Sequence, residues 1–240
     1  MPNIYRKIIN LSINGWSWLL DYLYVAYWQI HDFFIHENAA QYLTPASKLT
    51  ETPIILIPGI YENWQFMKPV ADVLYKAGHP IYIIDDLGFN TGDIEKMSEL
   101  VDAFLNKSHI TDCIIVAHSK GGLIGKYILA NLNTHRKVKG MVALNTPFSG
   151  SLYAYLMPLK STSIFKPNSP ILGQLAANTE INKTIVSIYG LFDPHIPKGS
   201  FLQGAQNLRL STRGHFRIMN NSSVHNAVLT AIKNMKERQL

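Results

Sequence analysis

Short apolar runs recur along the chain after residue 52, and helix-length amphipathic stretches separate them. The runs cover residues 53–59, 80–88, 112–119, 138–147, 184–190 and 207–211. Most of them are continuously hydrophobic, which is typical of strands that are covered on both faces. Because predicted helices alternate with these strands, the sequence predicts an α/β fold: a compact, mostly parallel sheet of about six strands with helices on both faces.

Size and composition fit one globular domain preceded by an extra segment. The 240 residues are 47% hydrophobic and 16% charged, which is enough apolar material for a full core. We expect the domain over residues 41–240 and an apolar, aromatic helical segment over residues 1–40.

The net charge is +6 at pH 7, but its distribution argues against a nucleic-acid partner. Basic residues are scattered, and the densest run, residues 135–139 ("HRKVK"), is typical of a solvated helix end. A nucleic-acid binder would gather its basic residues on one element. The same charge is compatible with a modest attraction to anionic lipid surfaces.

The chain holds one cysteine, Cys113, so an intramolecular disulfide is excluded. Cys113 lies inside an apolar run, where a buried, unreactive thiol is expected. No Cys/His cluster has the spacing of metal ligands, and the sequence predicts neither a metal nor a cofactor. The lack of paired cysteines is compatible with a cytoplasmic location, with or without membrane association.

Residues 8–35 are unusually rich in aromatic and aliphatic side chains. A helix from about residue 16 would bring Ser17, Asp21 and Asp32 near one face, because a helix advances about 100° per residue. The rest of its surface is apolar, so we expect an apolar neighbour on most sides.

The composition of this helix bears on four possible settings: a signal peptide, a membrane span, a membrane interface and a packed position on protein. No small-residue cleavage site follows Arg6 and Lys7, which argues against a signal peptide. A membrane span needs about 20 apolar residues, and Asp21 falls in the middle of the stretch. An interfacial helix and a helix packed on the domain or on a second copy are the two leading interpretations. The expected partners are therefore a membrane surface, contacted peripherally, or a homodimer.

Residues 148–182 interrupt the alternation of strands and helices. They mix Ser, Pro and Asn with large apolar side chains. Plain connections in such domains are short, so a long one is more typical of a functional insertion. We expect a cap over a cleft.

The third apolar run ends at Ser119, followed at once by a small-residue turn. Ser119 is either a helix cap or a nucleophile held on a sharp turn. A serine nucleophile needs a histidine base and a carboxylate that orients it. Functional groups of this architecture gather beyond the carboxyl ends of the strands, where Asp193 and His215 follow the fifth and sixth runs. The pattern therefore predicts a catalytic triad.

Other candidates for the acid and the base have weaker positions. Asp85 and Asp86 end an earlier strand and are the alternative to Asp193 as the acid. Three further histidines are considered and set aside as the base: His118, which is expected to pack at the turn, His195 and His225.

Residues 117–122, Ala-His-Ser-Lys-Gly-Gly, resemble the nucleophile elbow of the α/β hydrolases, with Ala117 in place of the first glycine. The order Ser, Asp, His along the chain also matches that fold. Three further segments are similar to bacterial lipases and esterases: residues 56–60 ("LIPGI"), 145–151 ("NTPFSGS") and 169–175 ("SPILGQL"). The resemblance extends over residues 53–235.

The resemblance implies a role for each residue. Ser119 would attack an ester carbonyl, and His215 would take its proton while Asp193 orients the imidazole. The backbone N–H groups of Ile60 and Lys120 would form the oxyanion hole.

The chain also departs from the family's pattern. Pro58 and Phe148 stand where the family usually has histidines, and the family's first two strands are missing. The resemblance implies a serine carboxylic-ester hydrolase that acts on hydrophobic or lipid esters through an acyl-enzyme. Two alternatives stay open: acyl transfer to an alcohol on the same triad, and a non-catalytic binding protein of this fold.

Overall fold

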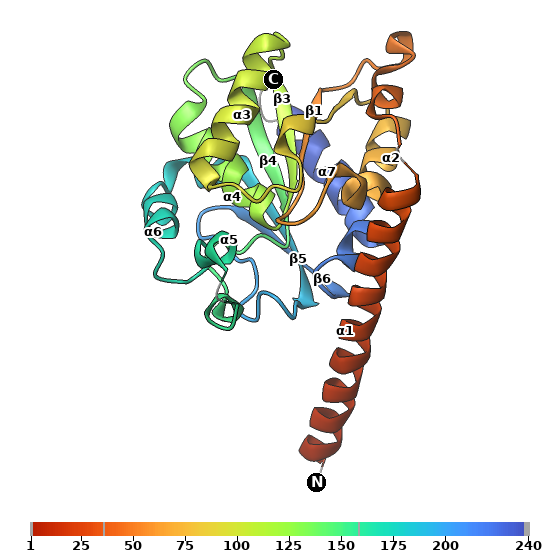
Figure 1. Ribbon diagram of the computed structural model, residues 1–240, viewed down its shortest axis with the longest axis vertical. Coiled ribbons are helices and arrows are strands. Elements are labelled where there is room, and N and C mark those ends of the chain that lie inside the picture. The colour runs from red at the N-terminus through yellow and green to blue at the C-terminus, as the bar shows by residue number, and fades with distance from the viewer. Residues whose placement is uncertain (1, 36, 158, 238–240) are drawn as a thin grey trace.

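The computed structural model describes residues 2–35, 37–157 and 159–237, which build one six-stranded sheet (Figure 1). The strands are β1 (Ile54–Ile57), β2 (Ile81–Tyr82), β3 (Cys113–His118), β4 (Val138–Leu144), β5 (Ile185–Phe192) and β6 (Gln206–Arg213). Their order is β2-β1-β3-β4-β5-β6, and every neighbouring pair is parallel. The prediction of a compact parallel sheet of about six strands is confirmed.

Helices cover both faces of this sheet (Figure 1). The α-helices of the chain are α1 (Pro2–Phe34), α2 (Lys68–Lys76), α3 (Ile94–Lys107), α4 (Lys120–Tyr127), α5 (Lys160–Ser163), α6 (Pro170–Ala177) and α7 (Ser222–Glu237). Helices α3, α4 and α6 contribute to the core on one face, and α2 and α7 to the core on the other.

The side chains of the central strands alternate between these two cores. In β1, Ile55 and Ile57 join the α3/α4 core, and Ile54 and Leu56 join the α2/α7 core. All four are at most 1% exposed. Both faces of β1 are buried from solvent, and this explains why every residue of the strand is hydrophobic.

Helix α1 runs along one edge of the domain, and its first turns project beyond it (Figure 1). It extends from Pro2 to Phe34, inside the segment over residues 1–40 that we expected to be helical. Proline suits the first helical position because its missing N–H needs no partner there, and no other proline interrupts the chain before residue 45. Ser17 and Asp21 are buried, whereas the side chain of Asp32 lies outside the described residues.

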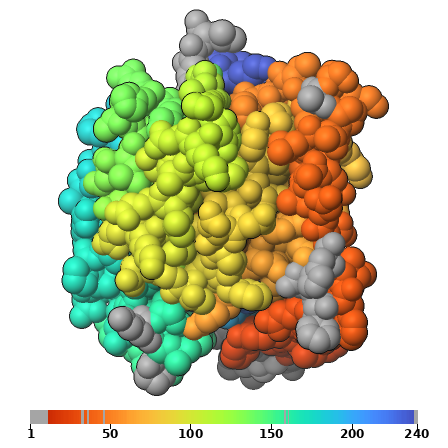
Figure 2. Space-filling model, turned by 45° about the horizontal axis from the view of Figure 1, so that its top comes forward, coloured from red at the N-terminus to blue at the C-terminus, as the bar shows by residue number. Residues whose placement is uncertain are grey.

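In the space-filling view, the red residues of α1 lie along the lower right edge of the domain, and the orange residues that follow it continue up the same side (Figure 2). Tyr24 donates a hydrogen bond to the carbonyl of Phe66 (3.2 Å), and Asn14 bonds Arg213. The helix is therefore fastened to the domain at several points. In the part of the chain that the structure describes, no helix combines the length and apolarity needed to cross a bilayer.

Candidate active site

Ser119 lies on the sharp turn between β3 and α4. Its φ of 49° is in the left-handed region, which is strained for a residue with a Cβ. A Cβ on Gly121 would lie 2.1 Å from the carbonyl oxygen of Ile57, and one on Gly122 would lie 1.9 Å from Oγ1 of Thr146. The turn therefore requires glycine at both positions. The close packing of α4 against β1 and Thr146 fixes the position of Ser119 on the turn.

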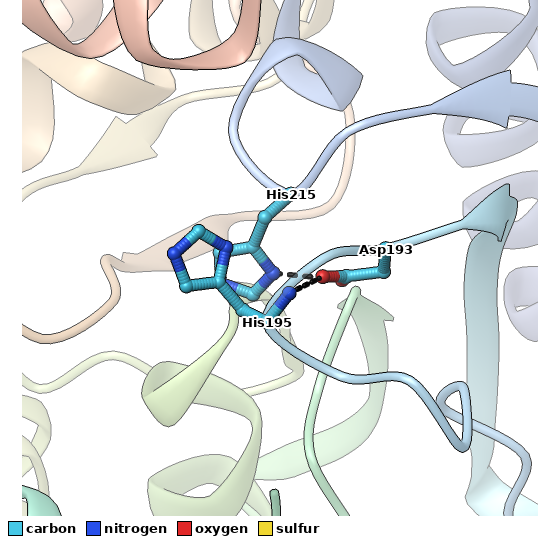
Figure 3. Close-up of side chains that lie close together, drawn as sticks. All are labelled: Asp193, His195 and His215. Atoms are coloured by element: carbon cyan, nitrogen blue, oxygen red, sulfur yellow. Dashed lines mark hydrogen bonds and ion pairs between the residues drawn. The ribbon is translucent and has the colours of Figure 1, made fainter. Parts of the chain in front are cut away.

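The structure brings the three predicted triad residues together. Oγ of Ser119 lies 3.0 Å from Nε2 of His215, and Nδ1 of His215 lies 2.7 Å from Oδ2 of Asp193 (Figure 3 shows the second contact). All three are buried, with at most 6% exposure. Nucleophile, base and acid thus form one hydrogen-bonded chain across the ends of β3, β5 and β6.

The second oxygen of Asp193 is held by the backbone. Oδ1 accepts hydrogen bonds from the N–H groups of His195 (2.8 Å) and Ile196 (3.0 Å). Burial raises the pKa of Asp193 to about 6, while electrostatic attraction by the His195 side chain and these two N–H donors oppose the rise. The carboxyl group is fixed at both oxygens, so its orientation toward His215 is fixed too.

His215 is held as a neutral imidazole. Burial lowers its pKa, and the positive charge of His118 lowers it further. The carboxylates of Asp21 and Glu62 act in the opposite direction. The net shift favours the unprotonated form, which is the form that can accept a proton from a hydroxyl.

His195 lies against His215, with ring centroids 4.8 Å apart (Figure 3). Its Nε2 is 3.1 Å from the hydroxyl of Tyr22 in α1, and burial lowers its pKa to about 4.

Ligand atoms of Asp193, His195 and His215 lie within 4.8 Å of one another, a spacing that a metal ion could also use. Both oxygens of Asp193 and both ring nitrogens of His215 already have partners, so hydrogen bonding explains the cluster.

His118 and Glu62 form a buried ion pair behind the nucleophile. Nδ1 of His118 lies 2.8 Å from Oε2 of Glu62, and its Nε2 lies 3.0 Å from the carbonyl oxygen of His215. Both partners are acceptors, so the imidazole must donate from both nitrogens and carries a positive charge. Burial opposes that charge, but Glu62 and the carbonyl outweigh it and raise the pKa of His118.

Asp21 was not foreseen as part of the site. Its carboxylate is fully buried and accepts three backbone hydrogen bonds, from the N–H groups of His215 (2.7 Å), Phe216 (2.8 Å) and Arg217 (2.8 Å). The signal in the sequence was a carboxylate in the middle of an apolar stretch, since a buried charge requires partners. The sequence pattern alone could not predict which backbone N–H groups would be the partners of Asp21.

Every polar atom of His215 consequently has a partner. Its N–H donates to Asp21, and its carbonyl accepts from His118 and from Nδ2 of Asn145 (3.1 Å). The two ring nitrogens contact Asp193 and Ser119. Segments from α1 to β6 together fix the position of this residue.

The two residues expected to supply oxyanion N–H groups flank Ser119. Ile60 lines the same cavity as Ser119, and Lys120 begins α4. The Lys120 ammonium is buried and donates to the carbonyls of Asn90 (2.7 Å) and Gly92, and burial lowers its pKa to about 8. Asn90 in turn donates to the carbonyl of Pro58 (2.7 Å), which ties the β1 loop to the elbow. The oxyanion roles themselves stay a prediction.

A mainly apolar cavity of about 270 Å³ opens onto Ser119 and His215. It is lined by Tyr22, Val25 and Gln29 of α1, by Ile60, Tyr61 and Phe66 after β1, and by Tyr153, Ala154, Met157, Thr162 and Phe165 of the β4–β5 insertion. The insertion and the N-terminal helix therefore form opposite walls of one pocket. That size is close to the lower end of typical ligand pockets, about 300 Å³.

The remaining candidates lie outside this cluster. Asp85 and Asp86 are exposed on a short 3-10 helix after β2, and His225 belongs to α7, where its Nε2 contacts the carbonyl of Met219 (2.7 Å). Phe148 is buried beside Lys126, whose ammonium lies 6.0 Å from the ring centroid. None of these residues lines the catalytic cavity.

Comparisons with known proteins agree with the fold described above. Residues 52–168 match the family model of the alpha/beta hydrolase fold. A mature lipase from Bacillus licheniformis is 15% identical, with a TM-score of 0.64 over 76% of this chain and 92% of that one. A monoacylglycerol lipase from Paleococcus ferrophilus is 12% identical, with a TM-score of 0.58 over 76% and 94% of the two chains.

An extracellular alpha/beta-hydrolase from a Paenibacillus species is 16% identical, with a TM-score of 0.54 over 75% of this chain and 99% of that one. No curated protein matches the sequence. At these identities the likeness concerns the fold.

Proposed function

The chain has the α/β-hydrolase fold, and from that premise we propose that it is a serine hydrolase of hydrophobic carboxylic esters. The observation that carries the proposal is the hydrogen-bonded chain from Ser119 through His215 to Asp193, with distances of 3.0 and 2.7 Å. A serine that only caps a helix does not require a buried histidine at its hydroxyl, nor a buried carboxylate behind that histidine. Ser119 has both.

The mechanism follows from this chain of contacts. Oγ of Ser119 attacks the ester carbonyl carbon while Nε2 of His215 takes the hydroxyl proton, and the N–H groups of Ile60 and Lys120 hold the oxyanion. His215 then returns the proton to the leaving alcohol, and an acyl-enzyme remains. Water attacks the acyl group, giving its proton to His215, and the acid leaves as Ser119 is reprotonated. Asp193 keeps the imidazole in the required tautomer throughout.

The lining of the cavity supports a hydrophobic acyl or alcohol group. Its walls are mainly aromatic and aliphatic side chains, with few polar atoms beyond the catalytic ones. Several rim residues, among them Tyr61 and Met157, are also exposed at the mouth. A long-chain ester would bury more apolar surface there than a short one, so a longer acyl chain should lower KM.

A fluorophosphonate probe tests the proposal directly. We expect intact-mass labelling of the wild type and of the matched control Ser149→Ala, an exposed serine outside the cavity, and no labelling of Ser119→Ala or His215→Ala. Labelling of Ser119→Ala, or none of a folded wild type with and without detergent micelles, would contradict the assignment. Product analysis in the presence of an added alcohol then separates hydrolysis from acyl transfer, since only transfer yields a new ester.

A further inference from the structure

Six large apolar side chains form a stripe along the outer face of α1. They are Trp16, Leu19, Leu23, Tyr27, Ile30 and Phe34, here called the outer stripe. Their spacing of three or four residues places them on one side of the helix. Each is between 49% and 75% exposed. We propose that the outer stripe docks the protein on the surface of an anionic lipid bilayer, with α1 lying in the plane of the interface.

A groove between α1 and α2, of about 940 Å³, borders one edge of the outer stripe. Its lining includes two stripe residues and three basic side chains: Leu23, Tyr27, Lys68, Lys76 and Arg217. Lys68 is paired with Asp72 at 3.2 Å, which leaves the charges of Lys76 and Arg217 for an outside anion. Basic side chains beside an apolar helix face are the arrangement that attracts anionic headgroups.

The other edge of the outer stripe leads to the catalytic cavity. Tyr22, on that flank of α1, is 48% exposed and lines the cavity. Across the mouth, Tyr153, Leu156 and Met157 of the insertion are exposed as well. An apolar surface thus extends from the basic groove to the mouth, and, if the proposed function holds, a lipid ester enters from the bilayer without crossing water.

A second copy of the chain fits this face less well than a bilayer. Another chain packed on α1 would crowd the mouth between Tyr22 and Tyr153, through which the proposed substrate passes. The only carboxylate among the described side chains of α1 is Asp21, and it is turned inward and fully buried. Among the described side chains, the outward face of α1 therefore presents no acid that would repel anionic lipid.

Vesicle flotation tests the docking without requiring catalysis. We expect wild type to bind phosphatidylglycerol vesicles, to bind phosphatidylcholine vesicles less, and to release as salt rises. Leu19→Ser/Leu23→Ser should weaken binding about tenfold or more, because two apolar side chains no longer enter the interface. Phe201→Ser is the matched control, since Phe201 is 53% exposed against 56% for Leu23 but lies outside α1.

Two outcomes would overturn the docking proposal. One is equal binding of the double variant and the wild type. The other is a wild-type dimer that becomes a monomer in the double variant by sedimentation, because a second copy would then cover the stripe. Hydrolysis of a short, water-soluble ester should be unchanged in both variants, so a failure of the proposed function would be seen separately.

A different observation carries a second proposal, which also rests on the proposed function. Asp21 accepts the N–H of the catalytic histidine itself at 2.7 Å, from a helix nearly 200 residues earlier in the chain. A Cβ on Gly214 would lie 2.6 Å from its Oδ1, so the loop closes tightly around the carboxylate. We infer that Asp21 is a positioning residue, which acts through the backbone of His215.

Asp21→Asn separates positioning from folding. The amide can still accept from Phe216 and Arg217 through Oδ1, but its NH₂ faces the N–H of His215, donor against donor. We expect kcat to fall about 10- to 100-fold with KM little changed, since a small misplacement of a catalytic group can cost about 10²-fold. Asn14→Ala, which loosens α1 only at its bond to Arg213, is the control and should retain activity.

Two readouts distinguish this role from simple destabilisation. Loss of the Asp21 charge should move the acid limb of the kcat/KM profile to lower pH, because that charge raises the pKa of His215. The other groups that face this imidazole are Glu62, His118, Asp193 and His195. The downfield Nδ1–H proton resonance of His215 should weaken in Asp21→Asn even if no ester is ever hydrolysed. An unchanged kcat, or an unchanged resonance and pH profile, would overturn the inference.

Discussion

Glu62 and His118 form an ion pair that is almost wholly shielded from water, with Oε2 and Nδ1 2.8 Å apart and side chains 2% and 1% exposed. Glu62 also accepts the N–H of Gly59 (2.7 Å), next to the predicted oxyanion residue Ile60. The pair therefore links the elbow, the β1 loop and, through the His215 carbonyl, the catalytic base.

Glu62→Gln should lower the free energy of unfolding by about 3–5 kcal/mol, because it leaves a charged imidazole buried without its counter-ion. Urea denaturation measures this change. Glu180→Gln is the control: Glu180 is 92% exposed beside Lys183, and its loss should change stability by less than about 0.5 kcal/mol. A loss below about 1 kcal/mol for Glu62→Gln would contradict a charged His118.

The pH dependence of kcat/KM should report the depressed pKa of His215. Activity requires the neutral imidazole and is lost as pH falls through its pKa. Burial and the charge of His118 lower that pKa, so the midpoint of the acid limb should lie below the ordinary value of 6.5. Removing the positive charge in His118→Gln should move the midpoint upward; a midpoint that does not rise would contradict a charged His118.

Stability should decline on acidification through a second histidine. Burial lowers the pKa of His195 to about 4, against 6.5 in the unfolded chain. Between these values the unfolded chain binds a proton that the folded protein does not, so this contribution is lost as pH falls from 6.5 toward 4. Tm measured across that window should fall less steeply in His195→Gln than in the wild type, and parallel curves would exclude His195 as a cause.

Two glycines should respond in opposite ways to alanine. Gly121→Ala would force a Cβ to within 2.1 Å of the Ile57 carbonyl, so the elbow must shift and activity should fall about 10²-fold or more. Gly173 in α6 has no atom within 4 Å of its Cβ position, and Gly173→Ala should stabilise the protein by about 0.5–1 kcal/mol. Thermal melts of both variants measure stability, and ester assays measure activity. Full activity in Gly121→Ala would contradict the close contact between residue 121 and the Ile57 carbonyl.

Much of the fold could be predicted because its signals are local. Apolar runs marked the strands, most clearly β1, β3 and β4, which are buried on both faces, and the elbow at Ser119 could be recognised from its neighbours in the sequence. Asp193 and His215 could be selected because parallel strands end at the same edge of a sheet.

The supporting contacts of the site could not be predicted, because they join segments with no shared pattern. Glu62 follows β1 and His118 ends β3, and only their packing brings them within 2.8 Å. Asp21 was recognised as unusual in an apolar stretch, but its partners are backbone groups, which every residue carries. Such contacts are specified by the tertiary fold alone.

The bond from Asp21 to His215 also bears on the order of assembly. It joins residues 194 positions apart, and α1 leaves the ribosome long before the loop after β6. Before residues 215–217 are made, the Asp21 carboxylate has none of its three N–H donors, and burying it would cost free energy. We therefore expect α1 to pack on the domain only after that loop has formed. The helix that is made early must dock late, and the catalytic histidine reaches its final geometry only when synthesis has passed residue 217.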